Sequence, residues 1–309
     1  MPAVFLNRTD ARPDGFAPSA VAIGNFDGVH RGHLSLVEAA GQWSSRIGGP
    51  AVAVTFDPPP YQVLFPNSPV RPPLTAMSDR VRLLHEAGAD HVAVLKTSPD
   101  LLALTPEDFF HDVIRGQLGA TAVVEGFNFR FGVNRTGSTN TLKRLCEASG
   151  LAFEEVPPLT WEFEPISSSR VRTALVNGDV SLAKDLLGRR YAIAGTVVRG
   201  AERGRTIGFP TANLADVATV LPGSGVYAVR AIVNGAAWPA AANIGPNPTF
   251  GESNQKIEVH LIGFSGNLYG TTLAVEFATK LRDTRPFSGV HELTEQLKRD
   301  IEAARTAVG

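Results

Sequence analysis

Short apolar runs alternate with amphipathic segments over the first half of the chain. The runs lie at residues 21–24, 51–56, 91–95, 120–125 and 151–156. Three helices are predicted between these runs. The first begins near Arg31, and the second begins at a capping Ser78 and ends at Gly88. The third begins at a capping Thr105, with Pro106 in its first turn. Strands that alternate with helices predict an α/β, Rossmann-like domain with a parallel sheet covered on both faces.

The pattern changes after Arg190. Two short helices are predicted before it, at residues 168–176 and 180–187, and short alternating runs separated by Gly, Pro and Asn follow it. The runs are YAIAGTVVRG, GVYAVRAIVNG, WPAAANIG, KIEVHLIGF and TLAVEFATKL. They predict an antiparallel β-barrel. A terminal helix is expected over residues 288–308, with an apolar stripe made of Val290, Leu293, Leu297 and Ile301. We therefore expect two domains, residues 1–187 and 188–309.

Composition narrows the classes of function. A net charge of -1 over 309 residues argues against a protein that binds nucleic acid by broad phosphate neutralisation. Cys146 is the one cysteine, so no disulfide forms within the chain and a reducing compartment is expected. No apolar run approaches about 20 residues and no secretory leader is evident, so we expect a cytoplasmic protein with no membrane partner. Whether it forms a homo-oligomer stays open.

The segment GNFDGVHRGH carries the first candidate site. His30 and His33 are three residues apart at a predicted helix start and therefore share one face. A helix N-terminus offers free N–H groups and the positive end of a dipole, which suit phosphate, and imidazoles there can stabilise a departing pyrophosphate. Gly24, Gly28 and Gly32 let a nucleotide approach the backbone. Taken alone, the pair also fits incidental surface histidines or a zinc site.

Two further segments place polar groups near the predicted sheet edge. ISSSRVR, residues 166–172, has serines that can cap a helix and bind phosphate, and two arginines with forked donors. GFNFRFG, residues 126–132, follows a predicted strand and offers Asn128 as a polar ligand. Alone, the first segment equally fits an ordinary capped helix, and the second fits a plain loop with core phenylalanines.

Together these motifs resemble one family. GNFDGVHRGH, TFDP at residues 55–58, GFNFRFG and ISSSRVR are similar, in order, to motifs of the prokaryotic bifunctional riboflavin kinase/FMN adenylyltransferase (FAD synthetase) family, whose N-terminal module is an H-x-G-H nucleotidyltransferase. The resemblance implies that His30 and His33 are catalytic. It also implies a set of ATP or flavin ligands: Gly24, Phe26, Asp27, Gly28, Asn128, Ser167, Ser168, Ser169, Arg170 and Arg172. The family usually has a histidine where Pro59 stands, and often a threonine where Ser169 stands.

The second half lacks the G-x-x-x-x-G-K-[ST] motif of a P-loop kinase. In its place, the segment GTVVRGAERGRTIGFPTAN carries glycines and arginines that suit ATP phosphates. They are Gly200, Arg203, Gly204, Arg205 and Gly208. Thr211 and Asn213 offer hard oxygen ligands suited to Mg²⁺. The alternative for this stretch alone is a glycine-rich hairpin that turns at Pro210.

The segment IEVHLIGF supplies Glu258. In a strand, Ile257, Val259 and Leu261 face one way, and Glu258 and His260 face the other. A carboxylate beside the γ-phosphate of ATP can accept a proton from an attacking primary alcohol. Without further context, a solvent-facing strand residue is the alternative.

The motifs of the second half resemble the other module of the same family. GRTIGFPTAN, GVYAV, NIGPNPTF, IEVHL and NLYG are similar, in order, to its riboflavin kinase module, so the resemblance covers about residues 21–300. It implies a six-stranded barrel with Glu258 as catalytic base and with Thr211 and Asn213 as ligands of magnesium and phosphate. The further ATP or flavin ligands that we assign to this module are Gly200, Arg203, Gly204, Arg205, Gly208, Pro210, Asn243 and Arg282.

Two ATP-dependent reactions follow from the resemblance. The ribityl 5′-hydroxyl of riboflavin attacks the γ-phosphate of ATP to give FMN, and the FMN phosphate then attacks the α-phosphate of a second ATP to give FAD and pyrophosphate. Riboflavin, FMN, FAD and ATP are the expected partners, with Mg²⁺ beside ATP. Two alternatives stay open: a monofunctional riboflavin kinase whose adenylyltransferase domain is impaired at Pro59, and a non-catalytic flavin-binding module.

Overall fold

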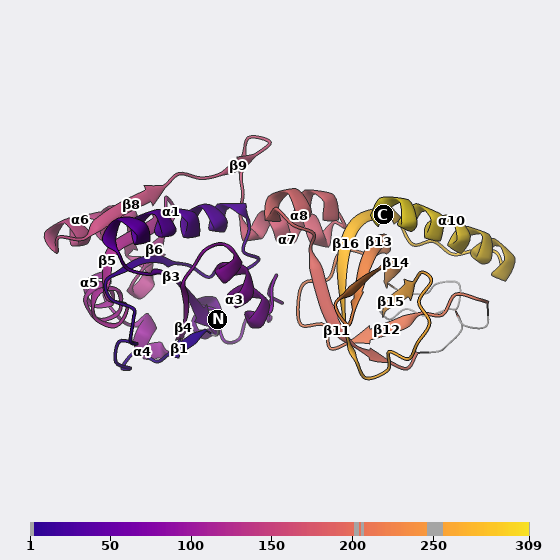
Figure 1. The fold of residues 1–309 in the computed structure, drawn as a ribbon, viewed down its shortest axis with the longest axis horizontal. Coiled ribbons are helices and arrows are strands. Elements are labelled where there is room, and N and C mark those ends of the chain that lie inside the picture. Colours follow the sequence, from indigo (N-terminus) through magenta and orange to yellow (C-terminus); the bar gives the residue numbers. More distant parts are fainter. Residues whose placement is uncertain (1–2, 201–203, 205–206, 246–255, 309) are drawn as a thin grey trace. The chain divides into compact units, whose positions relative to one another are not determined.

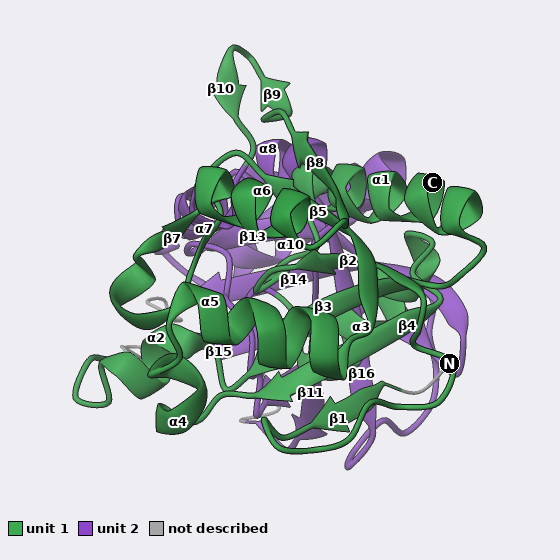
Figure 2. Cartoon of the chain, turned by 90° about the vertical axis from the view of Figure 1, so that its left-hand side faces the viewer, with its two compact units in different colours: residues 1–71, 75–166 green, residues 72–74, 167–309 purple. Residues whose placement is uncertain are grey.

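The computed structural model describes residues 3–200, 204, 207–245 and 256–308 (Figure 1). The chain packs as two compact units, unit 1 with residues 1–71 and 75–166 and unit 2 with residues 72–74 and 167–309 (Figure 2). The residues of the two predicted short helices thus pack with unit 2. The boundary between the functional modules at residue 187 stays a prediction.

A six-stranded sheet forms the centre of unit 1, in the order β1-β4-β3-β2-β5-β8, and every neighbouring pair is parallel. The strands are β1 (Val4–Leu6), β2 (Ser19–Ile23), β3 (Ala51–Asp57), β4 (His91–Lys96), β5 (Ala120–Gly126) and β8 (Ala152–Val156). The predicted parallel α/β fold is therefore confirmed. Strand β1 was not predicted, because its three residues are too few to show an alternating pattern.

Helices cover both faces of this sheet. They are α1 (Arg31–Ile47), α2 (Pro60–Leu64), α3 (Met77–Glu86), α4 (Pro99–Leu102), α5 (Pro106–Asp108), a π-helix (Phe109–Gln117), a 3₁₀ turn (Val133–Arg135) and α6 (Thr139–Ala148). Alternation along β2 sends Ile23 into one core with Phe110 and Leu142, and Ala22 into the other core with Val37 and Leu84. Two small hairpins lie outside the sheet, namely β6 (Arg130–Phe131) with β7 (Gly137–Ser138), and β9 (Thr160–Trp161) with β10 (Glu164–Pro165).

One of the predicted helix caps is confirmed and another is wrong. The Thr105 hydroxyl accepts the N–H of Asp108 at 3.1 Å, so it caps α5. Ser78 instead lies inside α3, whose N-cap is Ala76 and has no side-chain cap bond. Asp79 in the first turn supplies the negative charge that favours a helix N-terminus.

Unit 2 contains a closed barrel in the order β11-β12-β15-β14-β13-β16, in which β11 also pairs with β16. The strands are β11 (Ala192–Val198), β12 (Ala212–Ala215), β13 (Gly225–Val233), β14 (Ala236–Gly245), β15 (Lys256–Leu261) and β16 (Thr272–Arg282). Every pairing is antiparallel, so the predicted barrel is confirmed. Its helices are α7 (Ser168–Val176), α8 (Val180–Leu187) and the terminal α10 (Val290–Val308).

Helix α10 packs on the barrel through its C-terminal half. Ile301 and Ala304 join Ala228 and Ile262 in an apolar cluster, whereas Val290, predicted to lie on the buried stripe, is 52% exposed. That part of the prediction is wrong, because the first turns of the helix do not reach the barrel core.

A buried ion pair fixes the same helix to the end of β16. The Arg282 Nε atom lies 3.1 Å from both Asp300 carboxylate oxygens, and its Nη2 lies 2.8 Å from Oδ2. The Gln296 amide also donates to Asp300 Oδ1, at 2.9 Å. Asp300 therefore ties two turns of α10 to the barrel wall.

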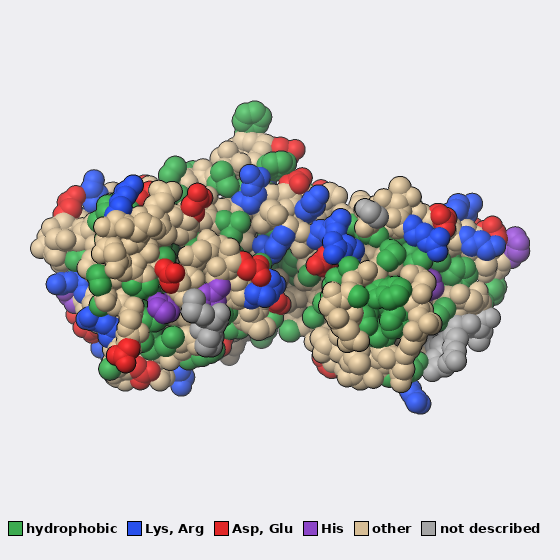
Figure 3. All heavy atoms as spheres, in the orientation of Figure 1, with side chains coloured by type: hydrophobic (Ala, Val, Ile, Leu, Met, Phe, Trp, Pro, Cys, Tyr) green, Lys and Arg blue, Asp and Glu red, His purple; other side chains and the backbone are tan. Residues whose placement is uncertain are grey.

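The surface agrees with the near-zero net charge. Basic and acidic side chains are interspersed over the face shown in Figure 3, and the net charge of the chain is -1. Within the residues that the structure describes, no helix is both long and apolar enough to span a bilayer.

Candidate active sites

The loop that follows β2 has an unusual backbone. Three of its residues have positive φ: Phe26 at 46°, Gly28 at 87° and Val29 at 39°. Bulky and β-branched side chains rarely adopt this region, so Phe26 and Val29 hold it only because their surroundings impose it. The loop leads directly to His30 and α1.

Side chains from the segment before α3 hold this loop in place. The Gly28 N–H donates to the Thr75 hydroxyl at 3.2 Å, and the Thr75 N–H donates to Asp27 Oδ1 at 3.3 Å. The two bonds clamp Asp27 and Gly28 from one residue. They link the predicted nucleotide loop to a part of the chain almost fifty positions away.

A buried arginine lies beneath the same loop. Arg80 Nη2 lies 3.4 Å from Asp27 Oδ1, and its Nη1 lies 3.4 Å from the Thr55 hydroxyl, which donates to the Asn25 carbonyl at 3.0 Å. The Arg80 side chain is only 3% exposed, and burial lowers its pKa although Asp27 and Asp57 oppose the shift. One guanidinium thus contacts Asp27 directly and is linked to Asn25 through the Thr55 hydroxyl.

His30 and His33 lie together, as predicted. His30 is the N-cap of α1, and its Nδ1 accepts the His33 N–H at 3.3 Å. The two rings stack with centroids 3.6 Å apart, and the Phe26 ring lies edge-on to His33 at 5.1 Å. Because Nδ1 is an acceptor, a neutral His30 carries its hydrogen on Nε2, which can donate to a phosphate oxygen. No group of three or more His, Cys, Asp or Glu gathers as a metal site among the described residues.

Asn128 lies at the neighbouring strand end. Strand β5 pairs with β2 and ends at Gly126, and the turn after it is closed by the Phe129 N–H donating to the Gly126 carbonyl at 2.9 Å. Asn128 is exposed in this turn, whereas Phe131 is buried in the core. Phe129 and Phe131 pack against the core, whereas Phe127 is 44% exposed, so the interpretation as core phenylalanines holds for two of the three rings and the ligand role of Asn128 stays a prediction.

Between these two strands lies a carboxyl group that was not predicted. Glu125 is 1% exposed, and its Oε1 accepts the Ile23 N–H at 2.9 Å. Burial raises the pKa of Glu125 well above its ordinary value, although backbone bonds to Ile23 and Gly126 oppose the shift. Glu125 therefore ties the end of β2 to the end of β5, where the predicted ligands begin.

The serine-rich segment caps α7. The Ser167 hydroxyl accepts the Arg170 N–H at 3.2 Å, and Arg172 Nη1 donates to the Pro72 carbonyl at 2.6 Å. These residues fall in unit 2. Contact with a nucleotide stays a prediction for Ser167, Ser168, Ser169, Arg170 and Arg172. Within unit 1, the Ile166 carbonyl lies 3.7 Å from the position that a Cβ on Gly32 would occupy.

In the barrel, register aligns three of the predicted residues. Glu258 on β15 pairs with Asn213 on β12 on one side and with Asn243 on β14 on the other. Directly paired side chains lie on the same face of a sheet, with Cβ atoms about 4.5–5.5 Å apart. The buried Ile257 and Val259 point to the opposite face, so a carboxylate stands between two amides outside the barrel core.

A glycine cradle lies over this row. A Cβ on Gly200 would come within 2.3 Å of the Asn213 amide nitrogen, and a Cβ on Gly204 within 2.3 Å of the Phe209 carbonyl oxygen. Gly208 has a φ of 88°. Arg203 and Arg205 lie outside the described residues, so their predicted contacts with phosphate stay predictions.

A histidine holds the segment that carries the predicted magnesium ligands. His260 Nδ1 lies 2.8 Å from the Pro210 carbonyl, and it must donate because a carbonyl only accepts. Thr211 directly precedes β12, and Asn213 lies on its half-buried side, opposite the buried Ala212. A hydroxyl and an amide beside the Glu258 carboxylate make an oxygen-rich set that fits Mg²⁺.

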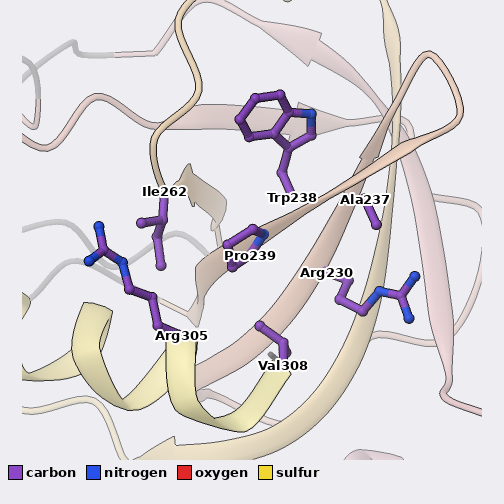
Figure 4. A pocket seen from close by; sticks show the side chains of 7 residues that line it. All are labelled: Arg230, Ala237, Trp238, Pro239, Ile262, Arg305 and Val308. Carbon is purple, nitrogen blue, oxygen red and sulfur yellow. The ribbon is translucent and has the colours of Figure 1, made fainter.

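Other features lie apart from this row. All three guanidinium nitrogens of Arg282 donate within the chain, to Asp300 and to the Asp283 carbonyl, and its contact with substrate stays a prediction. A pocket of about 370 Å³ lies between the barrel wall and α10, where Trp238, Ile262 and Arg305 are among its lining residues (Figure 4). None of the predicted site residues lines it.

Sequence reasoning missed the residues that support the two sites. Arg80 lies on the buried face of α3 with Leu83 and Leu84, so a charge on an apolar stripe was the available signal. His260 shares a strand face with Glu258, but its partner Pro210 is fifty positions away and gives no local signal.

The folds and sites define a class. A parallel sheet whose first helix begins at paired histidines, in one chain with a barrel that aligns a carboxylate and two amides, is the architecture of a two-module transferase that uses nucleotides.

Comparisons with known proteins make the assignment specific. Residues 14–170 match the model of FAD synthetase, and residues 187–308 match that of riboflavin kinase. The chain is 38% identical over 292 residues to the bifunctional riboflavin kinase/FMN adenylyltransferase of Bacillus subtilis, with 93% of this chain and 92% of that protein covered. It is 36% identical over 290 residues to the enzyme of the same description from Escherichia coli K12, with 94% and 92% covered. The chain belongs to the family of bifunctional riboflavin kinases/FMN adenylyltransferases.

A solved structure agrees with this fold. A crystal structure from Streptococcus pneumoniae, described as a macrolide-efflux protein, superposes with a TM-score of 0.87 at 32% identity and covers 98% of this chain and 99% of that one. That description names another activity, whereas both family models and the curated relatives agree on flavin chemistry.

Proposed function

We propose that this chain makes FMN in its barrel and FAD in its sheet unit, each reaction using its own ATP. In the barrel, the 5′-hydroxyl of riboflavin attacks the γ-phosphate of ATP, and Glu258 accepts the hydroxyl proton. Asn213 and Asn243 flank Glu258 in the strand register and orient the reactants. Little covalent chemistry is required of the protein, so position and charge dominate.

Thr211 and Asn213 would hold Mg²⁺ in this site. The ion supplies neutralisation of charge on the β- and γ-phosphate oxygens of ATP. The lack of a side chain at Gly200 and Gly204 lets the loop approach the Asn213 amide and the Phe209 carbonyl closely, and the His260 bond to Pro210 fixes the start of PTAN. The cradle and the oxygen ligands therefore support one nucleotide position.

In unit 1, the FMN phosphate attacks the α-phosphate of ATP and pyrophosphate leaves. His30 and His33, stacked at the N-terminus of α1, donate to the phosphates as negative charge develops. Asn128 binds at the neighbouring strand end, and the family resemblance assigns nucleotide or flavin phosphates to the segment from Ser167 to Arg172. No general base is required, because the attacking phosphate is already an anion near neutral pH.

The alignment of Asn213, Glu258 and Asn243 carries this proposal furthest. These residues come from three separate motifs, and only the barrel register places them side by side. A non-catalytic flavin-binding module does not require a carboxylate between two amides over a glycine cradle. The alternative of a kinase with an impaired adenylyltransferase rests on Pro59, which is the N-cap of α2.

The test is a chromatographic time course of the purified protein with riboflavin, ATP and Mg²⁺. We expect FMN to rise first and FAD to follow. FMN that accumulates without FAD would point to an impaired sheet unit, and Pro59→His would then be the first variant to make. Absence of FMN would sink the kinase assignment to Glu258, Thr211 and Asn213. A parallel time course without Mg²⁺ tests whether the reactions require the metal. The cytoplasmic location stays a prediction.

A further inference from the structure

The loop before α1 has an unfavourable backbone and an unfavourable charge beneath it. Phe26 and Val29 hold positive φ, which costs free energy at such residues and persists only where their surroundings impose it. Arg80 is a buried cation whose Nε has no hydrogen-bond partner among the described residues. Burial of a charge with an unsatisfied donor also costs stability. A strained backbone and a buried, incompletely hydrogen-bonded charge at the same place in a chain indicate a functional constraint.

Geometry shows what Arg80 contributes. Its two terminal nitrogens contact Asp27 and Thr55, and Thr55 in turn bonds the Asn25 carbonyl. Asp27 also accepts from Thr75, which binds Gly28. Arg80 therefore contacts both branches of this network, and the turn it supports ends at the helix cap His30.

We propose that Arg80 is a positioning residue for adenylyl transfer, acting through Asp27 and Thr55 to hold the 25–29 loop so that His30 and His33 face the phosphates. Its guanidinium does not itself touch the nucleotide, because the side chain is 3% exposed beneath the loop. This inference rests on the proposed role of the histidines.

The test uses the full-length chain, with its kinase reaction as the internal measure of an intact barrel and thermal unfolding as the measure of an intact unit 1. Arg80→Met removes the charge at similar length. Arg82→Met is the matched control, because Arg82 lies on the same helix, is 56% exposed and pairs with Asp79 and Glu86. For Arg80→Met we expect kcat for FAD formation to fall about 10- to 100-fold, with KM for ATP and FMN changed less than about twofold. The control should match wild type.

A double mutant separates positioning from a general structural effect. If Arg80 acts by orienting His30, Arg80→Met combined with His30→Ala loses no more activity than His30→Ala alone. Losses that multiply, or a raised KM for ATP with kcat unchanged, would overturn the proposal. Wild-type activity in Arg80→Met would overturn it as well.

Two further variants keep the question answerable if Arg80→Met destabilises unit 1. Arg80→Lys keeps the charge but reaches one acceptor at a time, so we expect partial recovery of kcat; full recovery would show that charge alone suffices and would contradict positioning. Arg80→Met with Asp27→Asn removes both charges, and restored folding without restored kcat supports the proposal. If wild-type protein and His30→Ala form FAD equally well, the role of the histidines is wrong, which is distinguishable from failure of Arg80 alone.

Discussion

The two units of this chain build their sites in opposite ways. In the sheet unit, the histidines and the loop before them are contiguous in sequence. This loop has a strained backbone, and the buried Arg80 holds it at the end of β2. In the barrel, the key residues are distant in sequence, and the pairing of three regular strands brings Asn213, Glu258 and Asn243 together. The first site depends on a local conformation that must be supported, and the second depends on register.

This difference predicts different sensitivities. A register-built site tolerates loss of a neighbour because the strands still align, but it has no substitute for its central carboxylate. A loop-built site depends on every contact that holds its backbone.

Substitution of the central carboxylate should have the largest effect. Glu258→Gln keeps the size and the strand pairing but removes the base, so we expect riboflavin phosphorylation to fall about 10²- to 10⁴-fold. FAD formation from supplied FMN should be unchanged. Chromatographic rates with each substrate measure both, and Glu276→Gln on β16 of the same barrel is the control. Loss of both reactions in folded protein would contradict two independent sites.

Removal of the capping histidine should act on the other reaction. His30→Ala should lower FAD formation about 10²- to 10³-fold, because a donor to the developing phosphate charge is lost. FMN formation should match wild type, and the exposed His111→Ala serves as control. A parallel fall in FMN formation would show that the units do not work separately.

Breaking the buried ion pair should destabilise the barrel alone. Asp300→Asn leaves Arg282 without its carboxylate, so we expect a loss of about 3–5 kcal/mol in the free energy of unfolding of unit 2. Hydrogen exchange followed by mass spectrometry should show faster exchange in α10 and β16 and unchanged exchange in β2. The exposed Glu295→Gln in the same helix should leave both unchanged. Equal protection in both variants would contradict the anchoring role.

The smallest effect concerns Glu125 and depends on pH. Burial raises its pKa in the folded state, so its contribution to stability is fully present below the unfolded pKa and is lost as pH rises toward the folded pKa. Glu125→Gln keeps an oxygen acceptor for Ile23 without the charge. We expect the variant to be more stable than wild type at pH 8 by about 1.4 kcal/mol per unit of raised pKa, with the gap closing toward pH 4.

Thermal unfolding followed by calorimetry at the two pH values measures this gap. Glu155→Gln, an exposed position on neighbouring β8, is the control and should follow wild type at both. A gap of constant size across the pH range would show that ionisation of Glu125 is not its cause.

The sequence predicted most of the fold because periodicity reports burial. The runs that became β2, β3, β4, β5 and β8 show apolar patterns, and the β15 pattern placed Glu258 opposite Ile257 and Val259. The error at Ser78 has a physical reason, since α3 begins after Ala76 without a side-chain cap, so a capping residue in the sequence did not mark its start. Val290 was misplaced because periodicity indicates an apolar face but not how far the packing partner extends.

The supporting residues of the sites were beyond sequence patterns for a different reason. Thr75, Arg80 and His260 act through hydrogen bonds to distant segments, and no spacing rule connects them to their partners. Glu125 looked like the end of an apolar run, and only the pairing of β5 with β2 shows its carboxylate at the Ile23 amide.

Closure of the barrel has a consequence for how the chain is made. The barrel closes when β11 pairs with β16, which joins Ala192 to Glu276, whereas the six strands of the parallel sheet all precede residue 157. A ribosome that adds about 5–20 residues per second completes the sheet unit seconds before the last barrel strand exists. Pairing between such distant strands is also intrinsically slow. During synthesis, therefore, the module that consumes FMN is folded before the module that produces it.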